Sequence, residues 1–366
     1  MYSLTAYFVK LLSNLQPNED RAELARDIPD KLRDYLKYTD KIKTVDPQTR
    51  LSGSYSRYTA IKEIKDVDVL LFVSKDYNDG EESIKKVIND LVSTLKGFPE
   101  YLKDETGYVD ADLALKRQRR SVQVHITLSG QEFDIDVVPS IAVDGIDKPL
   151  LVPDRDLSKW ISSDPLGYGK FLSKLNKENS DKVVPLIKIF KHWRDIQMKR
   201  MRPKSYWLEC IVCKHADTSK LNVTNSSWGE LFLSLMNAVF DDYYDKWKNS
   251  ESVPAIKDPV LGNNVAKSWT RSEFSSFMNR LEEAKRLAEK ALKEDDKAKA
   301  INLWQELFND DDEAEYFPSV IEESFAKALL AGSLVVSSSG QVLSNLSKAE
   351  KSWQSPPHRN FGDNDE

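Results

Sequence analysis

The chain has few of the features that mark secreted or membrane-embedded proteins. It contains two cysteines, Cys210 and Cys213, in 366 residues. This number excludes a disulfide framework and favours a reducing compartment. No apolar run reaches the length of a membrane span, and no basic start precedes an apolar segment as in a signal peptide. We therefore expect a cytoplasmic protein with no membrane partner.

The chain also has no excess of positive charge. Lysine and arginine number 53 against 59 aspartates and glutamates, and the formal net charge is −6. Strong non-specific binding to a polyanion requires the opposite balance, although a local basic groove remains compatible with it. Eight tryptophans, fourteen tyrosines and fourteen phenylalanines indicate packed cores rather than a disordered chain.

Hydrophobic periodicity predicts a mixed first half followed by a helical second half. A strand is predicted at 64–73, and an antiparallel hairpin at 121–128 and 133–140. Helical spacing of apolar residues predicts helices at 3–15, 20–38, 82–96, 166–178, 181–201, 205–216, 228–247, 270–294, 296–309 and 318–331.

Three parts of the chain follow from these patterns. Residues 1–160 are expected to form an α+β core that includes the N-terminal helices. Residues 161–335 are expected to form an all-helical lobe, with a cleft between the two lobes. Residues 336–366 are polar and rich in serine, so we expect a flexible tail.

Two of the predicted strands carry pairs of aspartates. Asp66 and Asp68 lie two apart in the first strand, and Asp134 and Asp136 repeat this spacing in FDIDVVPS. Because side chains alternate across a strand, each pair shares one face. A divalent cation relieves the repulsion between such carboxylates, and Mg²⁺ prefers oxygen ligands. For a single Asp-x-Asp pair, exposed polar residues on a half-buried strand are the commoner explanation.

A Gly-Ser pair precedes the first aspartates at a fixed distance. Gly53 and Ser54 are followed by eleven residues and then by Asp66. Glycine lets backbone amides approach a phosphate closely, and a serine hydroxyl adds a hydrogen bond. The ordered set of Gly-Ser, Asp-x-Asp and a later acidic strand is much more specific than any one of its parts.

This ordered set resembles the polymerase-beta-type nucleotidyltransferase superfamily. The stretch GSYSRYTAIKEIKDVDVLL is similar to the bacterial CD-NTases, which are related to 2′-5′-oligoadenylate synthase and cyclic GMP-AMP synthase. The third acid of that family precedes a short hydrophobic-proline segment, as in DVVP here, so the resemblance implies Asp136 and not Asp134. It implies a bilobal fold with a mixed sheet and a helical C-terminal lobe.

Further motifs extend the resemblance over about residues 45–330. LIKIFKHWRD resembles a helix whose lysine, here Lys191, meets the donor triphosphate, whereas the role of Lys188 stays open. PKSYWLEC resembles a segment whose serine, here Ser205, contacts phosphate and whose tyrosine, here Tyr206, stacks on a base. DPVLGNNVAKSW and the stretch 304–318 also match. Ser205 as a helix N-cap and Tyr206 as a core aromatic are the alternatives.

The chain departs from the family in two places. Tyr58 stands where bacterial members often carry a small residue. The chain also lacks a Cys/His cluster like the zinc thumb of cyclic GMP-AMP synthase, which argues against activation by DNA of that kind.

The resemblance implies an enzyme that binds nucleoside triphosphates, ATP among them, and uses two Mg²⁺ ions, with Mn²⁺ as the alternative. Asp66, Asp68 and Asp136 are then the metal ligands and catalytic residues. The product is a cyclic di- or trinucleotide second messenger of bacterial antiphage (CBASS) defence. A downstream effector recognises it, and regulatory proteins act on the enzyme. The alternatives are extension of an RNA end and a catalytically silent nucleotide-binding protein.

The remaining chemically active residues have simpler explanations. Cys210 and Cys213 form a Cys-x-x-Cys pattern near His215, but they fall within one predicted helix, so packing is favoured over a zinc site. His125 lies in an alternating strand and is expected on its polar face. The mixed charges of 283–300 predict a solvated helix surface.

Overall fold

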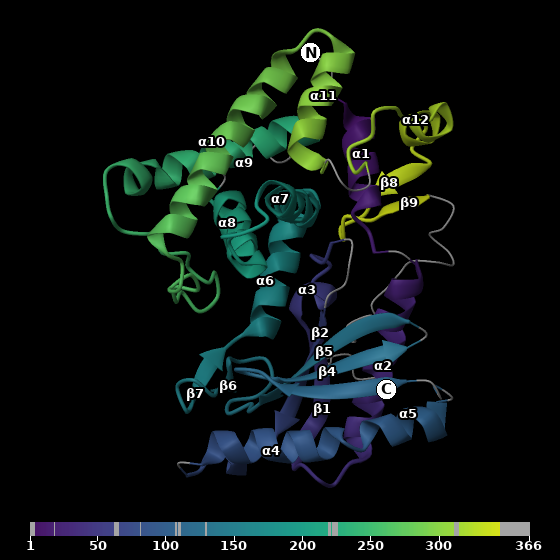
Figure 1. The fold of residues 1–366 in the computed structure, drawn as a ribbon, viewed down its shortest axis with the longest axis vertical. Coiled ribbons are helices and arrows are strands. Elements are labelled where there is room, and N and C mark those ends of the chain that lie inside the picture. The colour runs from purple at the N-terminus through teal and green to yellow at the C-terminus, as the bar shows by residue number, and fades with distance from the viewer. Residues whose placement is uncertain are drawn as a thin grey trace.

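The protein folds into a lobe built on a β-sheet and a lobe of packed helices, which lie one above the other in Figure 1. The α+β class predicted from the sequence is confirmed. The computed structural model describes residues 4–17, 19–61, 66–80, 82–106, 108, 111–128, 130–218, 221, 226–310 and 315–344. Within these residues, no helix combines the length and the apolar character needed to cross a membrane.

The first lobe contains a five-stranded mixed sheet. Its strand order is β1-β2-β5-β4-β3. β2 and β5 pair in parallel, and the other neighbouring pairs are antiparallel, including the predicted hairpin of β4 and β5. The strands are β1 (Thr44–Ser52), β2 (Asp66–Val73), β3 (Asp112–Arg117), β4 (Val122–Leu128) and β5 (Gln131–Ser140).

One face of the sheet is covered by helices α2 (Glu19–Tyr38), α4 (Ser83–Leu95) and α5 (Phe98–Thr106), with the short 3₁₀ turn η1 (Lys75–Asn78) before α4. The alternating apolar residues of the central strands point into this layer. They form one core with the helices, which includes Val67, Val69, Leu71, Val73, Phe133, Ile135 and Val137. Alternation therefore turns the intervening aspartates to the opposite face.

The opposite face of the sheet is only partly covered. Leu70 and Phe72 pack there against Leu150 at the start of β6. β6 (Leu150–Asp154) pairs with β7 (Lys159–Ser163) as a separate hairpin that leads to the helical lobe. The covered part lies toward the end of β2, whereas the aspartates lie at its beginning. The sheet lies below the helical lobe in Figure 1.

The second lobe is a set of helices around a large aromatic core. Capping boxes at Ser227 and Thr270 satisfy the first amides of α9 and α10. The helices are α6 (Pro165–Glu178), α7 (Val183–Gln197), α8 (Ser205–Asp217), α9 (Trp228–Lys248), α10 (Arg271–Lys293), α11 (Lys297–Phe308) and α12 (Glu323–Leu330). These helices start and end close to the predicted positions, except that α12 begins five residues later.

Helix α1 (Thr5–Asn14) lies in the helical lobe, which differs from the prediction that both N-terminal helices accompany the sheet. Its Phe8 packs edge-on against Trp304, with ring centroids 4.9 Å apart, and also against Phe317. α2 does cover the sheet. The first helix of the chain therefore belongs to the second lobe, and the segments that follow it form the first lobe (Figure 1).

The segment predicted as a flexible tail begins with regular structure. β8 (Leu334–Val336) and β9 (Val342–Ser344) form a hairpin, and the turn between them contacts the helical lobe. Lys188 donates to the Ser339 carbonyl at 2.7 Å, and Asn176 donates to the Ser338 carbonyl at 2.8 Å. For residues 336–344 the prediction is therefore wrong, and residues 345–366 lie outside the described chain.

Candidate active site

The four aspartates of the two central strands lie side by side. In the parallel pairing of β2 with β5, Asp66 is opposite Asp134 and Asp68 is opposite Asp136. The backbone register therefore brings together Asp66, Asp68 and Asp136, the three metal ligands that the resemblance implies. Oδ1 of Asp134 lies 2.7 Å from Nδ1 of His125 on β4.

Crowding of these carboxylates changes their protonation. Burial, followed by the charges of Asp68, Asp66 and Asp134, raises the pKa of Asp136 to about 7. Burial and then Asp66 raise the pKa of Asp68 to about 6, although Arg57 opposes the shift. Oδ1 of Asp136 is buried and has no hydrogen-bond partner. The pKa of a carboxyl group rises when it is shielded from water and lies beside other negative charges, because both effects disfavour the ionised form.

These observations fit a site for a divalent cation. A cation offsets the repulsion between Asp68 and Asp136 and supplies a partner for the unpaired Asp136 oxygen. Within the described ranges, no three His, Cys, Asp or Glu side chains already form a complete ligand set. The backbone register therefore brings the acids together, while their side chains are not gathered around one point.

The Gly-Ser pair touches this acidic site. Gly53 and Ser54 begin the one-turn helix α3 (Gly53–Ser56), which joins β1 to the segment before β2. Gly53 has a positive φ of 75°. A Cβ atom at this position would lie 1.7 Å from Oδ2 of Asp68, so only glycine fits. The predicted phosphate loop and the predicted metal ligand are therefore in direct contact.

The loop after α3 folds back on Ser54. The amides of Thr59 and Ala60 both donate to the Ser54 carbonyl, at 2.9 and 3.2 Å. Tyr58, which departs from the family pattern, has a φ of 59° and permits this reversal. Residues 53–60, here called the Gly-Ser loop, therefore form a closed turn whose geometry depends on Thr59.

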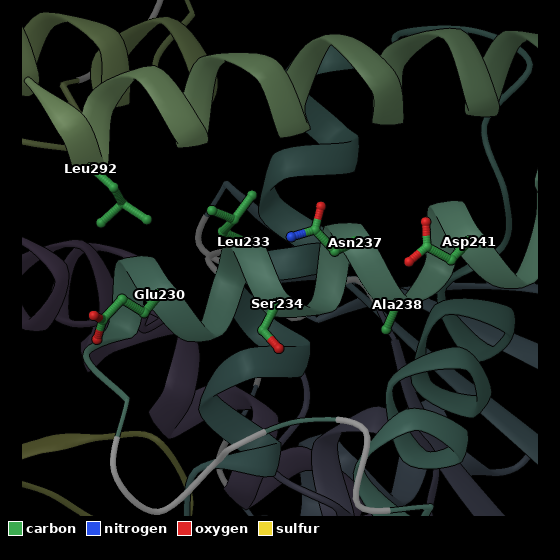
Figure 2. A pocket seen from close by; sticks show the side chains of 7 residues that line it. All are labelled: Glu230, Leu233, Ser234, Asn237, Ala238, Asp241 and Leu292. Atoms are coloured by element: carbon green, nitrogen blue, oxygen red, sulfur yellow. The ribbon is translucent and has the colours of Figure 1, made fainter.

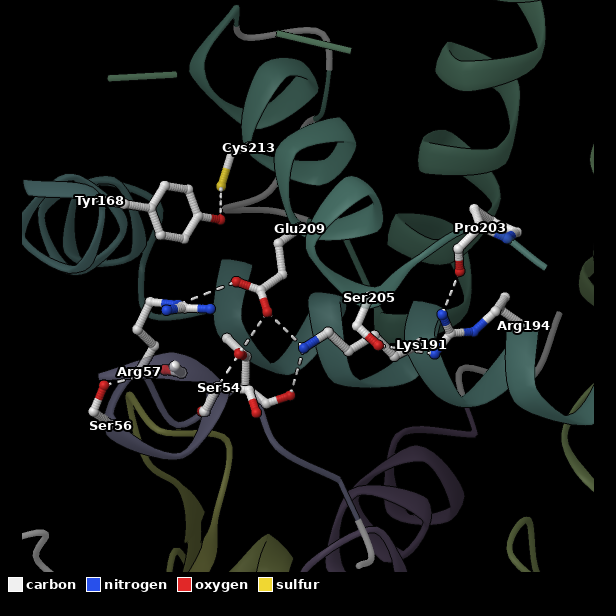
Figure 3. Close-up of polar contacts among 12 residues, drawn as sticks. Ser54, Ser56, Arg57, Tyr168, Lys191, Arg194, Pro203, Ser205, Glu209 and Cys213 are labelled. Atoms are coloured by element: carbon white, nitrogen blue, oxygen red, sulfur yellow. Dashed lines mark hydrogen bonds and ion pairs between the residues drawn. The ribbon is translucent and has the colours of Figure 1, made fainter. Parts of the chain in front are cut away.

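Lys191 does not face solvent as a free phosphate ligand. It is 2% exposed, and its Nζ donates to Oε1 of Glu209 at 2.6 Å and to the Thr59 carbonyl at 2.9 Å (Figure 3). Its direct role at a triphosphate, implied by the resemblance, does not agree with this geometry. The reason is that α7 is buried on all sides, so its lysines find partners inside the protein.

Ser205 and Tyr206 lie at the start of α8. Ser205 is exposed and accepts a hydrogen bond from Nη2 of Arg194 at 3.1 Å. The N-cap of α8 is Lys204, so Ser205 does not cap this helix. Tyr206 is half-buried and donates to Asp258 at 2.8 Å. The phosphate contact of Ser205 and the base stacking of Tyr206 stay predictions.

Three residues important to the loop were not found from the sequence. Arg57 and Thr59 lie in the Gly-Ser loop, and Glu209 lies in α8. Glu209 is 1% exposed and contacts both of them, as well as Lys191 (Figure 3). The available signal was an acidic residue among the apolar residues of YWLECIVC, because an unpaired charge is rarely buried.

The other chemically active residues have structural roles. Cys210 and Cys213 are buried in the core of the helical lobe, as predicted, and burial raises the pKa of the Cys213 thiol to about 12. Nε2 of His192 lies 2.8 Å from the Phe308 carbonyl. His125 is on the polar face of its strand, but its pairing with Asp134 was not predicted.

A hollow of about 530 Å³ lies elsewhere, between α9 and α10 (Figure 2). Its described lining includes the carboxylates of Glu230 and Asp241, the amide of Asn237 and the apolar Leu233 and Leu292. No basic side chain is among these lining residues. This hollow is therefore poorly suited to a triphosphate, unlike the Gly-Ser loop beside the aspartates.

Comparison with known proteins was made against families, curated sequences and solved structures. Residues 2–176 match the Second Messenger Oligonucleotide or Dinucleotide Synthetase (SMODS) domain. A cyclic AMP-AMP-AMP synthase of Acinetobacter sp. (strain ATCC 27244 / 9458) is 33% identical over 347 residues, which cover 92% of this chain and 92% of that protein. A cyclic AMP-AMP-AMP synthase of Escherichia coli (strain MS 115-1) is 26% identical over 312 residues, or 79% of this chain and 90% of that protein.

A solved structure shares the fold. The E. coli MS115-1 CdnC structure with ATP has a TM-score of 0.64 at 18% identity and covers 84% of this chain and 98% of that chain. The sequence relatives support the family assignment more strongly than this fold similarity, because the match at 33% identity extends over nearly the whole of both chains. The chain therefore belongs to the CD-NTase family of nucleotidyltransferases, the cyclic oligonucleotide synthases.

Proposed function

We propose that this enzyme joins nucleoside triphosphates, ATP among them, into a cyclic di- or trinucleotide and releases pyrophosphate. The observation that carries the proposal is the alignment of Asp66 and Asp68 with Asp134 and Asp136, directly beside Gly53. The two cyclic AMP-AMP-AMP synthases among its relatives favour adenine as the base and a trinucleotide as the product.

In the proposed reaction, Asp66, Asp68 and Asp136 are the catalytic residues and the metal ligands. When bound, two Mg²⁺ or Mn²⁺ ions neutralise the triphosphate and lower the pKa of the attacking ribose hydroxyl. Gly53 and Ser54 hold the phosphates through the closed turn of the Gly-Ser loop. Ser205, which is exposed at the start of α8, contributes a further phosphate contact in this proposal.

The bond changes are those of an in-line phosphoryl transfer. The ribose hydroxyl oxygen bonds to the α-phosphorus, the bond to the β-phosphate oxygen breaks, and the hydroxyl proton leaves to solvent. For a trinucleotide, a second transfer adds a third nucleotide to the linear product in the same way. In the last transfer, the free hydroxyl of the linear product attacks the α-phosphorus of its own 5′-triphosphate, which closes the ring and releases one more pyrophosphate. Positioning of the two reactants and neutralisation of charge supply most of the rate.

The proposed biological role is second-messenger signalling in antiphage (CBASS) defence in the cytoplasm, with an effector protein that recognises the product. Regulatory proteins are expected as partners. In support, a solved E. coli MS115-1 CdnC structure is a complex with a HORMA protein, and it has a TM-score of 0.61 to this chain.

The test is pyrophosphate release from purified protein incubated with the four triphosphates and Mg²⁺, followed by mass spectrometry of phosphatase-resistant products. Asp66→Ala with Asp68→Ala is expected to abolish release, because it removes the charges that bind the cations. The matched control is Asp134→Asn, which lies on the same face but is paired with His125, and it is expected to retain most activity.

Three results would contradict the proposal. Activity in the double variant would remove these aspartates from the site. Extension of added RNA without a product from triphosphates alone would favour an RNA-end transferase. Binding of ATP without turnover under any condition would favour a silent nucleotide-binding protein.

A further inference from the structure

Glu209 of α8 is a buried carboxylate beside the Gly-Ser loop, and both of its oxygens accept hydrogen bonds. Its Oε1 accepts from Lys191 Nζ at 2.6 Å and from Thr59 Oγ1 at 2.9 Å, and its Oε2 accepts from Arg57 Nε at 3.3 Å. Burial would raise the pKa of Glu209, but Arg57 and Lys191 together with these hydrogen bonds lower it to about 2. The carboxylate is therefore ionised inside the protein.

The partners of Glu209 come from both lobes. Arg57 and Thr59 belong to the Gly-Ser loop of the first lobe, whereas Lys191 belongs to α7 of the second. The Arg57 guanidinium also enters the helical lobe, where it lies 5.0 Å from the ring centroid of Tyr168 and 5.9 Å from that of Tyr206. Figure 3 shows the side chains of Arg57 and Lys191 pointing toward the Glu209 carboxylate.

Contacts lead directly from Glu209 to the phosphate-binding atoms. Glu209 holds the Thr59 hydroxyl, and Lys191 holds the Thr59 carbonyl. The Thr59 amide in turn donates to the Ser54 carbonyl. Ser54 follows Gly53, which touches Asp68. The hydroxyl, the carbonyl and the amide of Thr59 thus all make hydrogen bonds, and together these hold the closed turn in place.

We propose that Glu209 is a positioning residue. It fixes the Gly-Ser loop, which lies beside the catalytic aspartates, against the helical lobe. This inference rests on the proposed function of the loop as the phosphate-binding site. Glu209 is 1% exposed, so its carboxylate is closed off from a substrate. It acts through Arg57, Thr59 and Lys191, and without its charge two cations remain buried without a counter-ion.

The experiment compares Glu209→Gln with Asp154→Asn. Asp154 is also fully buried and pairs with Arg119 at 2.8 Å, but it lies in β6 and does not contact the Gly-Ser loop. Both variants lose a buried charge, so both are expected to be less stable. Thr59→Val is a milder variant that removes the hydroxyl and leaves the ion pairs in place.

Two measurements are made below the unfolding temperature of each variant. For Glu209→Gln, kcat/KM for pyrophosphate release is expected to fall about 100-fold, because misplacement near 1 Å has effects of this size. Deuterium exchange at the Thr59 and Ala60 amides is expected to be about tenfold faster, because the loop opens locally. Thr59→Val should change both in the same direction by a smaller factor, and Asp154→Asn should change neither.

The outcomes separate the two proposals. Equal effects of Glu209→Gln and Asp154→Asn would overturn the positioning role and leave only a loss of stability. Normal loop exchange in Glu209→Gln would overturn it as well. If the unmodified enzyme releases no pyrophosphate, the proposed function fails, while the exchange measurement still decides whether Glu209 orders the loop.

Discussion

The structure requires glycine at position 53 for two reasons, and replacement of Gly53 by alanine violates both. The first is backbone conformation, because a φ of 75° strains any residue with a Cβ atom, at a cost of about 1–2 kcal/mol. The second is space. The added Cβ would lie 1.7 Å from Oδ2 of Asp68, whereas ordinary contact begins near 3.4 Å, so the separation has to double.

Gly80 provides a matched control for the first demand alone. Its φ is 86°, and a Cβ at this position meets nothing within 4 Å. Gly80→Ala and Gly53→Ala should therefore both lose about 1–2 kcal/mol of the free energy of unfolding from backbone strain. Only Gly53→Ala displaces Asp68, and we expect its kcat/KM to fall about 100-fold or more, because reacting groups must be placed to within about 1 Å.

The assays are urea unfolding for stability and pyrophosphate release for activity. The result that would refute this reasoning is a Gly53→Ala enzyme as active as Gly80→Ala. Such a result would mean that Asp68 can leave its place beside the loop without loss of function.

Two further predictions concern protonation. Because the pKa values of Asp68 and Asp136 are raised to about 6 and about 7, their contribution to stability is present at low pH and is lost as the pH rises through these values. Mg²⁺ should therefore raise the Tm more at pH 8 than at pH 5.5, and equal shifts at both pH values would contradict the proposed cation site. Burial raises the pKa of the Cys210 and Cys213 thiols, so neither should react with a thiol reagent at pH 8 until the protein unfolds, and rapid labelling of the native protein would count against their packing.

Local patterns were sufficient to predict the acidic face. Asp66 and Asp68 alternate with Val67 and Val69, and this alternation alone determines which side chains enter the core. The pairing of β4 with β5 also followed from a short linker between two alternating segments. These local patterns did not determine the parallel pairing of β2 with β5, which joins strands that are distant in the sequence.

Hydrophobic periodicity could not predict the contacts between segments that are distant in the sequence. Lys188 and Lys191 lie three residues apart, as on an exposed helix face, but α7 is surrounded, and their partners are Ser339, Glu209 and Thr59. Likewise, the amphipathic pattern of α1 predicts a buried face and does not say which lobe buries it. The identity of the partner is set by the tertiary fold.

The position of Glu209 has a mechanical consequence. Because its carboxylate joins groups from both lobes in a dry interior, pulling the lobes apart at this point would strand three charges. Separation of the lobes at this point would also release the hydroxyl and the carbonyl of Thr59 from their partners in the helical lobe.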